Sequence, residues 1–172
     1  MAKRQKLPLG PVLVWALPLL VQIIFTNHIP TGNYFWLFVL PYAVIHFPVG
    51  QSGIRLMCSA FALGIVCDFF TVGTVFGVWA AALTASAYLR GFILRMIVPS
   101  LTVKKRLEPS IANFGLAKQT IFSLMVMAVF SIVFALFECV GSGDFAACGV
   151  RVLLSWIIGS AICLLSDFLF QR

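Results

Sequence analysis

The sequence predicts an all-α integral membrane protein with six transmembrane helices in one polytopic domain, residues 1–172. Charged residues make up 10% of the chain and hydrophobic residues 62%, with a mean hydropathy of +1.07. Soluble domains average about a quarter charged residues, so this composition is typical of a membrane protein. The apolar residues also fall into segments of membrane-crossing length, separated by short polar links.

The expected spans cover, in chain order, residues 7–25, 34–49, 54–70, 75–98, 119–137 and 150–170. The first follows a basic stretch and continues past Leu20 without a small-residue cleavage site, so we expect a retained helix rather than a signal peptide. The second is short, begins with an aromatic run and contains Pro41, His46 and Pro48. We interpret its aromatic start as an anchor at the membrane interface.

The distribution of positive charge predicts that both termini are cytoplasmic. Short cytoplasmic loops are rich in Lys and Arg. With six spans, Arg151 alone of the 12 Lys and Arg residues falls on the outer side. The net charge of +7 is therefore interpreted as orienting the chain, with no role in binding nucleic acid. We expect the basic stretch 104–106 to contact anionic lipid rather than a specific protein.

The sequence contains no Gly-rich nucleotide loop with a lysine and no metal-ligand spacing. His28 and His46 are far apart, and neither has a carboxylate at helical spacing. We interpret His28 as a polar loop residue near the outer headgroups and His46 as a structural residue near the inner end of its span. We therefore expect no enzymatic activity, no cofactor and no metal.

Asp68 is the acidic residue of the third apolar segment. A carboxylate in such a segment needs a partner, water or the membrane surface. One interpretation is a proton or cation site of an ion-coupled transporter. The other, which we favour, is a structural contact to backbone N–H groups at the turn 71–73. Arg90 and Arg95 are expected to extend to the inner headgroups, and Asp167 is the candidate partner for Arg90.

Small residues recur every four positions at the start of the fourth span, at Gly73, Gly77, Ala81 and Ala85. Close approach over small residues is what holds helices together in lipid. We expect this ridge to pack within the molecule rather than to form a dimer seam.

Cys58, Cys67 and Cys163 lie inside the expected spans, where cysteine packs as a small apolar residue. Cys139 and Cys148 flank the outer link between the last two spans, where an oxidising compartment permits a disulfide. A bridge between them is a hypothesis at this point, because spacing alone does not set the required approach of the two Cα atoms.

Several motifs together resemble one family. They are Asn27 to Ile29, the stretch from Gly64 through Asp68 to Phe70, residues 77–82, residues 87–90 with Arg95, and Glu108-Pro109 with Gly115. The chain resembles MreD, the small membrane subunit of the bacterial rod-shape system, in its Bacteroidetes-like form. An acidic residue seen near the inner end of the second span in similar sequences has no counterpart in residues 46–49. The candidate interaction residues are Asn27, Gly64, Asp68, Gly73, Gly77, Ala81, Arg90, Arg95, Glu108 and Pro109.

The resemblance implies a non-catalytic scaffold of the elongasome in the bacterial inner (cytoplasmic) membrane. MreD-like proteins associate with MreC and, through it, with MreB filaments, RodA and a class B penicillin-binding protein. The family is also similar in fold to the substrate-binding subunits of energy-coupling-factor transporters, although fold alone does not establish function.

The alternative is a small-molecule-binding subunit of a membrane transporter. It would need a pocket with convergent polar groups. The first span, around residues 11–22, lacks the Ala-rich docking stripe that the vitamin-transporter subunits carry. The polar residues available to such a pocket are Gln22, Asn27, Asp68, Ser86 and Glu138.

Overall fold

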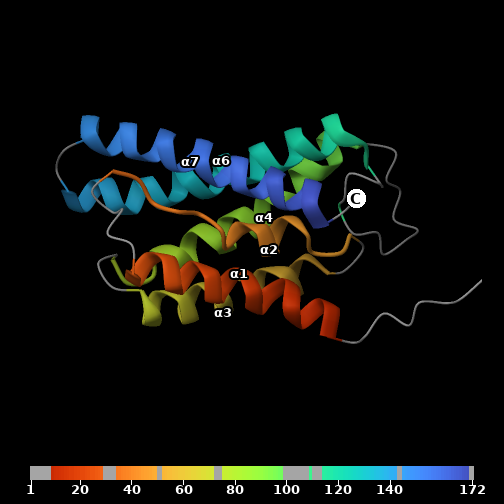
Figure 1. Cartoon of the computed structure of the whole chain (residues 1–172), viewed down its shortest axis with the longest axis horizontal. Coiled ribbons are helices and arrows are strands. Elements are labelled where there is room, and N and C mark those ends of the chain that lie inside the picture. Colours follow the sequence, from red (N-terminus) through yellow and green to blue (C-terminus); the bar gives the residue numbers. More distant parts are fainter. Residues whose placement is uncertain are drawn as a thin grey trace, which may run out of the picture.

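A computed structural model describes residues 9–28, 34–49, 52–71, 75–98, 109, 114–142 and 145–170 (Figure 1). The secondary structure of these residues is helical, with no strand among them. The helices are α1 (Leu9–His28), α2 (Pro41–Ile45), α3 (Gly53–Phe70), α4 (Val78–Ile97), α6 (Leu116–Ser142) and α7 (Phe145–Phe170). The predicted all-α class is confirmed for this part of the chain.

Within the described residues, 4 helices are long and apolar enough to cross a membrane: α3, α4, α6 over Leu116–Val140 and α7 over Ala146–Phe168. Large apolar side chains remain exposed along them, including Phe69 at 71% and Val140 at 74%. Lipid tails accept such a surface, whereas soluble proteins rarely expose large apolar patches. The chain is therefore a multi-pass membrane protein.

The expected helix over residues 34–49 does not form. Only Pro41–Ile45 is helical, and residues 35–39 have no regular secondary structure. Proline fits the first turn of a helix but not its interior, so Pro41 lets a helix begin there and not earlier. Pro48 follows two residues after the C-cap His46, where proline prevents the helix from continuing. In Figure 1 the segment 34–49 runs along the helices, from the end of α1 toward the start of α3.

The core is built around the non-helical part of this segment. Phe38 is buried, and its ring lies 4.9 Å from that of Phe130 and 5.0 Å from that of Phe134, both on α6. Trp79 at the start of α4 lies 5.1 Å from Phe134. Edge-to-face aromatic contacts of this kind add to the stabilisation from burial alone. The segment 34–49 is thus a central component of the packing.

Candidate functional site

Asp68 caps the N-terminus of α4. Its Oδ1 accepts a hydrogen bond from the backbone N–H of Trp79 at 3.2 Å, and its Oδ2 accepts one from Ala80 at 3.1 Å. The first N–H groups of a helix have no partner within the helix, and the positive end of the helix dipole favours a carboxylate there. The contact is structural, as favoured from the sequence, but the partners lie in α4. Of the expected turn 71–73, residues 72 and 73 lie outside the described part.

Gly64 lies one turn before Asp68 and allows α4 to come close. A Cβ atom at Gly64 would lie 2.3 Å from the Cα of Ala80 and 2.6 Å from its backbone nitrogen. The glycine therefore places the first turn of α4 within reach of the carboxylate. Gly77 is the N-cap residue of α4 and has a φ of 94°, a conformation that favours glycine. Gly64 and Asp68, one turn apart in α3, therefore both contact the first turn of α4 and form one junction between the two helices.

The other residues of the predicted ridge in α4 are less buried than the remaining alanines of that helix. Ala81 and Ala85 are half-buried, whereas Ala82 and Ala87 are fully buried. Gly73 lies outside the described residues. Gly64 of α3 packs closely against Ala80 of α4, which is not one of the ridge residues.

Three other candidates have separate locations. Asn27, near the end of α1, donates a hydrogen bond to the backbone oxygen of Phe70 at 2.7 Å, which ties α1 to the end of α3. Arg95 is exposed in the last turn of α4, and Pro109 is buried. Glu108 lies outside the described residues.

Gln22 holds the irregular backbone of residues 37–40. Its Nε2 donates to the oxygen of Leu37 at 2.7 Å, and its Oε1 accepts from the N–H groups of Val39 and Leu40 at 2.8 and 3.3 Å. Non-helical backbone at membrane depth must have its polar groups satisfied by the protein. Gln22 supplies those partners from α1 and is itself fully buried. From the sequence, Gln22 was expected only as a polar residue available to a ligand pocket; in the structure it binds the backbone of residues 37–40.

Arg90 is buried, with 5% of its surface exposed, so the expectation that it extends to the headgroups was wrong. Its guanidinium donates hydrogen bonds to the backbone oxygens of Ile45 and Phe47 and lies over the ring of Phe122, 5.7 Å from its centre. The last carbonyl groups of a helix have no partner within it. Arg90 supplies one at the end of α2, which is why the guanidinium turns inward.

Asp167, the expected partner of Arg90, contacts His46. Its Oδ1 lies 2.7 Å from Nε2 of His46, and its Oδ2 accepts a hydrogen bond from the amide of Gln119 at 3.1 Å. His46 and Asp167 are both buried. Asp167 thus contacts a histidine far away in the sequence, a pairing that helical spacing does not predict.

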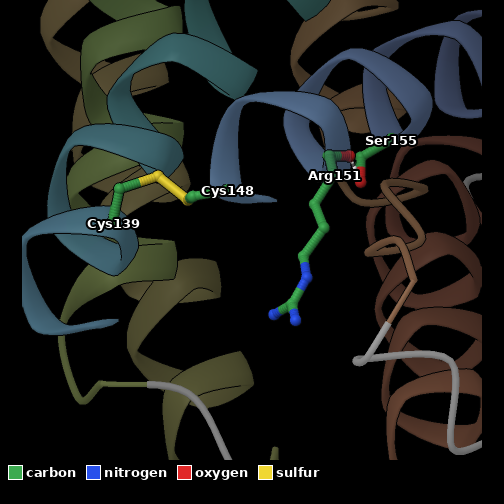
Figure 2. Close-up of a disulfide and its surroundings, with 4 residues drawn as sticks. All are labelled: Cys139, Cys148, Arg151 and Ser155. Carbon is green, nitrogen blue, oxygen red and sulfur yellow. Dashed lines mark hydrogen bonds between the residues drawn. A yellow bond between two sulfur atoms is a disulfide. The ribbon is translucent and has the colours of Figure 1, made fainter. Parts of the chain in front are cut away.

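A disulfide joins Cys139 at the end of α6 to Cys148 at the start of α7, with their Cα atoms 5.7 Å apart (Figure 2). Arg151 follows one turn later, and Figure 2 shows its side chain extending from α7 without touching the disulfide. Its backbone oxygen accepts a hydrogen bond from Ser155, whose Oγ also accepts the N–H of Trp36. The start of α7 is thus linked both to α6 and to the segment 34–49.

The described residues contain no group of three or more His, Cys, Asp or Glu side chains arranged to hold a metal ion. Some buried polar atoms of α4 and α6 have no hydrogen-bond partner in this part of the chain. They are Nε1 of Trp79 and Nε of Arg90 on α4, and Oε1 of Gln119, Oγ of Ser123 and Oε2 of Glu138 on α6. Buried polar atoms of this kind are normally satisfied by ordered water or a ligand.

No family model, curated protein or solved structure matches this chain.

Proposed function

We propose that the chain is a non-catalytic membrane scaffold of the MreD type that binds MreC and helps to organise lateral cell-wall synthesis. In this proposal the chain crosses the bacterial inner membrane six times, with the segment 34–49 as the second crossing and both termini in the cytoplasm. MreB, RodA and the class B penicillin-binding protein would be reached directly or through MreC.

The observation that supports the proposal most directly is that Asp68 has a structural role as the cap of α4. An ion-coupled transporter needs a carboxylate in its spans that can bind and release the ion. Both oxygens of Asp68 instead accept backbone N–H groups of α4. Gln22 and Arg90 likewise bind backbone atoms of the segment 34–49. These polar side chains stabilise the fold, which favours a rigid framework over a moving one.

The experiment compares co-purification with MreC from detergent-solubilised membranes and cell shape after depletion of the chain. The scaffold proposal predicts that MreC is recovered with the chain and that depleted cells lose their rod shape. Asp68→Asn should retain MreC binding per folded molecule, because Asn keeps an acceptor for the cap. Rod-shaped depleted cells together with no recovery of MreC would contradict the proposal.

The second candidate is the small-molecule-binding transporter subunit. It is favoured by the buried polar atoms of Arg90, Gln119 and Ser123 that have no partner in the described residues, because a bound polar molecule would satisfy them. This candidate predicts that a small molecule co-purifies with the chain and that Ser123→Ala weakens its binding. Mass spectrometry of the denatured, purified protein would identify such a molecule.

A further inference from the structure

Three of the buried polar atoms without a partner belong to side chains gathered at Phe122 of α6. The guanidinium of Arg90 lies over the ring of Phe122, 5.7 Å from its centre. Gln119 and Ser123 are one turn apart on α6 and share the buried face of Phe122. Nε of Arg90, Oε1 of Gln119 and Oγ of Ser123 have no hydrogen-bond partner among the described residues. All three side chains are more than nine-tenths buried. Because burying such atoms unsatisfied is costly, they indicate a site for a polar ligand.

Ser123 differs from the other buried serines of the described helices. The hydroxyl groups of those serines each donate to the backbone oxygen four residues earlier, at Ser86, Ser131, Ser155 and Ser160. Serine commonly satisfies its hydroxyl in this way inside a helix. Ser123 makes no such bond, although it is fully buried. Its hydroxyl is therefore available to a ligand.

The three atoms require a ligand that both accepts and donates hydrogen bonds. Nε of Arg90 only donates, and the hydroxyl of Ser123 can donate. The amide of Gln119 is oriented by Asp167, since its Nε2 donates to Oδ2 at 3.1 Å. Oε1 of Gln119, which only accepts, is the amide atom left without a partner. A ligand that satisfies all three atoms carries acceptor oxygens together with one donor.

The charge of Arg90 favours an anion at this site. An arginine side chain is always charged, and a buried charge is normally paired. The guanidinium donates to the backbone oxygens of Ile45 and Phe47, which are neutral groups. Within the described residues, the ion-pair contact joins His46 to Asp167, so no carboxylate pairs directly with Arg90. An anion at Nε would supply that pairing.

We propose that Arg90, Gln119 and Ser123 form a binding site for a small protonated oxyanion, of the hydrogenphosphate or bicarbonate type. The oxygens of the ion accept hydrogen bonds from Nε of Arg90 and Oγ of Ser123, and its O–H group donates to Oε1 of Gln119. The phosphodiester of a lipid headgroup has no O–H group and leaves Oε1 unsatisfied. This inference deepens the second candidate function, on which it rests, by naming the class of molecule bound.

The test is equilibrium dialysis of radiolabelled inorganic phosphate against the full chain in maltoside micelles at neutral pH. Binding should be saturable, and bicarbonate should displace the label. Sulfate has a similar shape but no O–H group at neutral pH, so at equal ionic strength it should compete at least about tenfold more weakly. A phosphodiester lipid added to the micelles should not displace the label.

Ser123→Ala is the discriminating variant, because it removes one donor to a charged ligand. We expect it to weaken phosphate binding by at least about tenfold. Ser123→Thr keeps a hydroxyl group and should recover most of the affinity lost in Ser123→Ala. Ser131→Ala is the matched control on the same helix, because the hydroxyl of Ser131 already donates to the backbone of Met127. It should bind phosphate as the wild-type chain does.

Two results of the dialysis would overturn the proposal. One is the lack of saturable phosphate binding, as expected of a site that takes only water. The other is a Ser123→Ala chain that binds phosphate as tightly as Ser131→Ala does. Displacement by sulfate or by the lipid as effective as that by bicarbonate would also contradict it. A co-purified molecule of another chemical class, with no phosphate or bicarbonate binding, would support the second candidate function and overturn this inference.

Discussion

Gly64→Ala tests the junction between α3 and α4. The added Cβ would lie 2.3 Å from the Cα of Ala80, and ordinary contact begins at 3.4 Å, so the two helices must part by roughly 1 Å. The hydrogen bonds from Trp79 and Ala80 to Asp68 are already 3.2 and 3.1 Å long. A separation of this size takes both beyond hydrogen-bonding distance. The substitution therefore disrupts the packing and the helix cap together.

The expected cost follows from these two effects. Overpacking a close contact costs about 1–3 kcal/mol, and loss of a helix cap costs about 0.5–2 kcal/mol. We expect Gly64→Ala to lower the free energy of unfolding by about 3 kcal/mol. Reversible unfolding by SDS in mixed micelles, followed by tryptophan fluorescence, measures this change.

Gly91→Ala is the matched control, because a Cβ there meets nothing within 4 Å. It should leave stability unchanged or raise it by up to about 1 kcal/mol, since alanine favours helix. The double variant with Asp68→Asn should cost less than the sum of its single changes, because both act on one cap. A Gly64→Ala chain as stable as wild type, or strictly additive costs, would refute the proposed junction.

The remaining predictions concern the other polar contacts. Gln22→Leu leaves the N–H groups of Val39 and Leu40 without their partner and should cost about 2–4 kcal/mol in the same unfolding assay; Leu20→Ala, at a 57% exposed position, should cost far less. Arg90→Lys removes the planar guanidinium, one nitrogen of which donates to both backbone oxygens while the group lies over Phe122, and should destabilise by about 1–3 kcal/mol, whereas Arg95→Lys should be close to neutral; equal effects would contradict the buried position of Arg90. Alkylation of the denatured chain without reductant should modify Cys58, Cys67 and Cys163 alone, and reduction should add Cys139 and Cys148; five adducts before reduction would contradict the disulfide.

The sequence predicted the all-α membrane class because composition and segment length decide it. It also indicated that Asp68 is structural, since the residue lies near the end of an apolar segment, where a neighbouring helix begins. The backbone N–H groups that bind Asp68 could not be predicted from the sequence. Which N–H groups reach Asp68 depends on the close approach at Gly64 and on the left-handed conformation of Gly77, and both are consequences of three-dimensional packing.

The segment 34–49 was the main difference from the prediction. Its hydropathy is that of a span, and hydropathy does not distinguish an extended buried segment from a helix. Pro41 and Pro48 were the available signals. The deciding contacts come from Gln22, Arg90 and Asp167 on three separate helices, at distances in sequence where no periodic pattern connects them. The pairing of His46 with Asp167 was missed for the same reason.

The most direct test of the scaffold proposal is site-specific photo-crosslinking to MreC in intact membranes. The crosslinker is placed at exposed apolar positions at the end of the molecule where α4 and α7 begin and α6 ends, namely Phe76, Val140 and Leu153, with the buried Phe130 as the matched control. A scaffold with a defined partner surface predicts crosslinks to MreC from adjacent positions on one side of the molecule and none from Phe130. Crosslinks to lipid alone from every exposed position would contradict the proposed association.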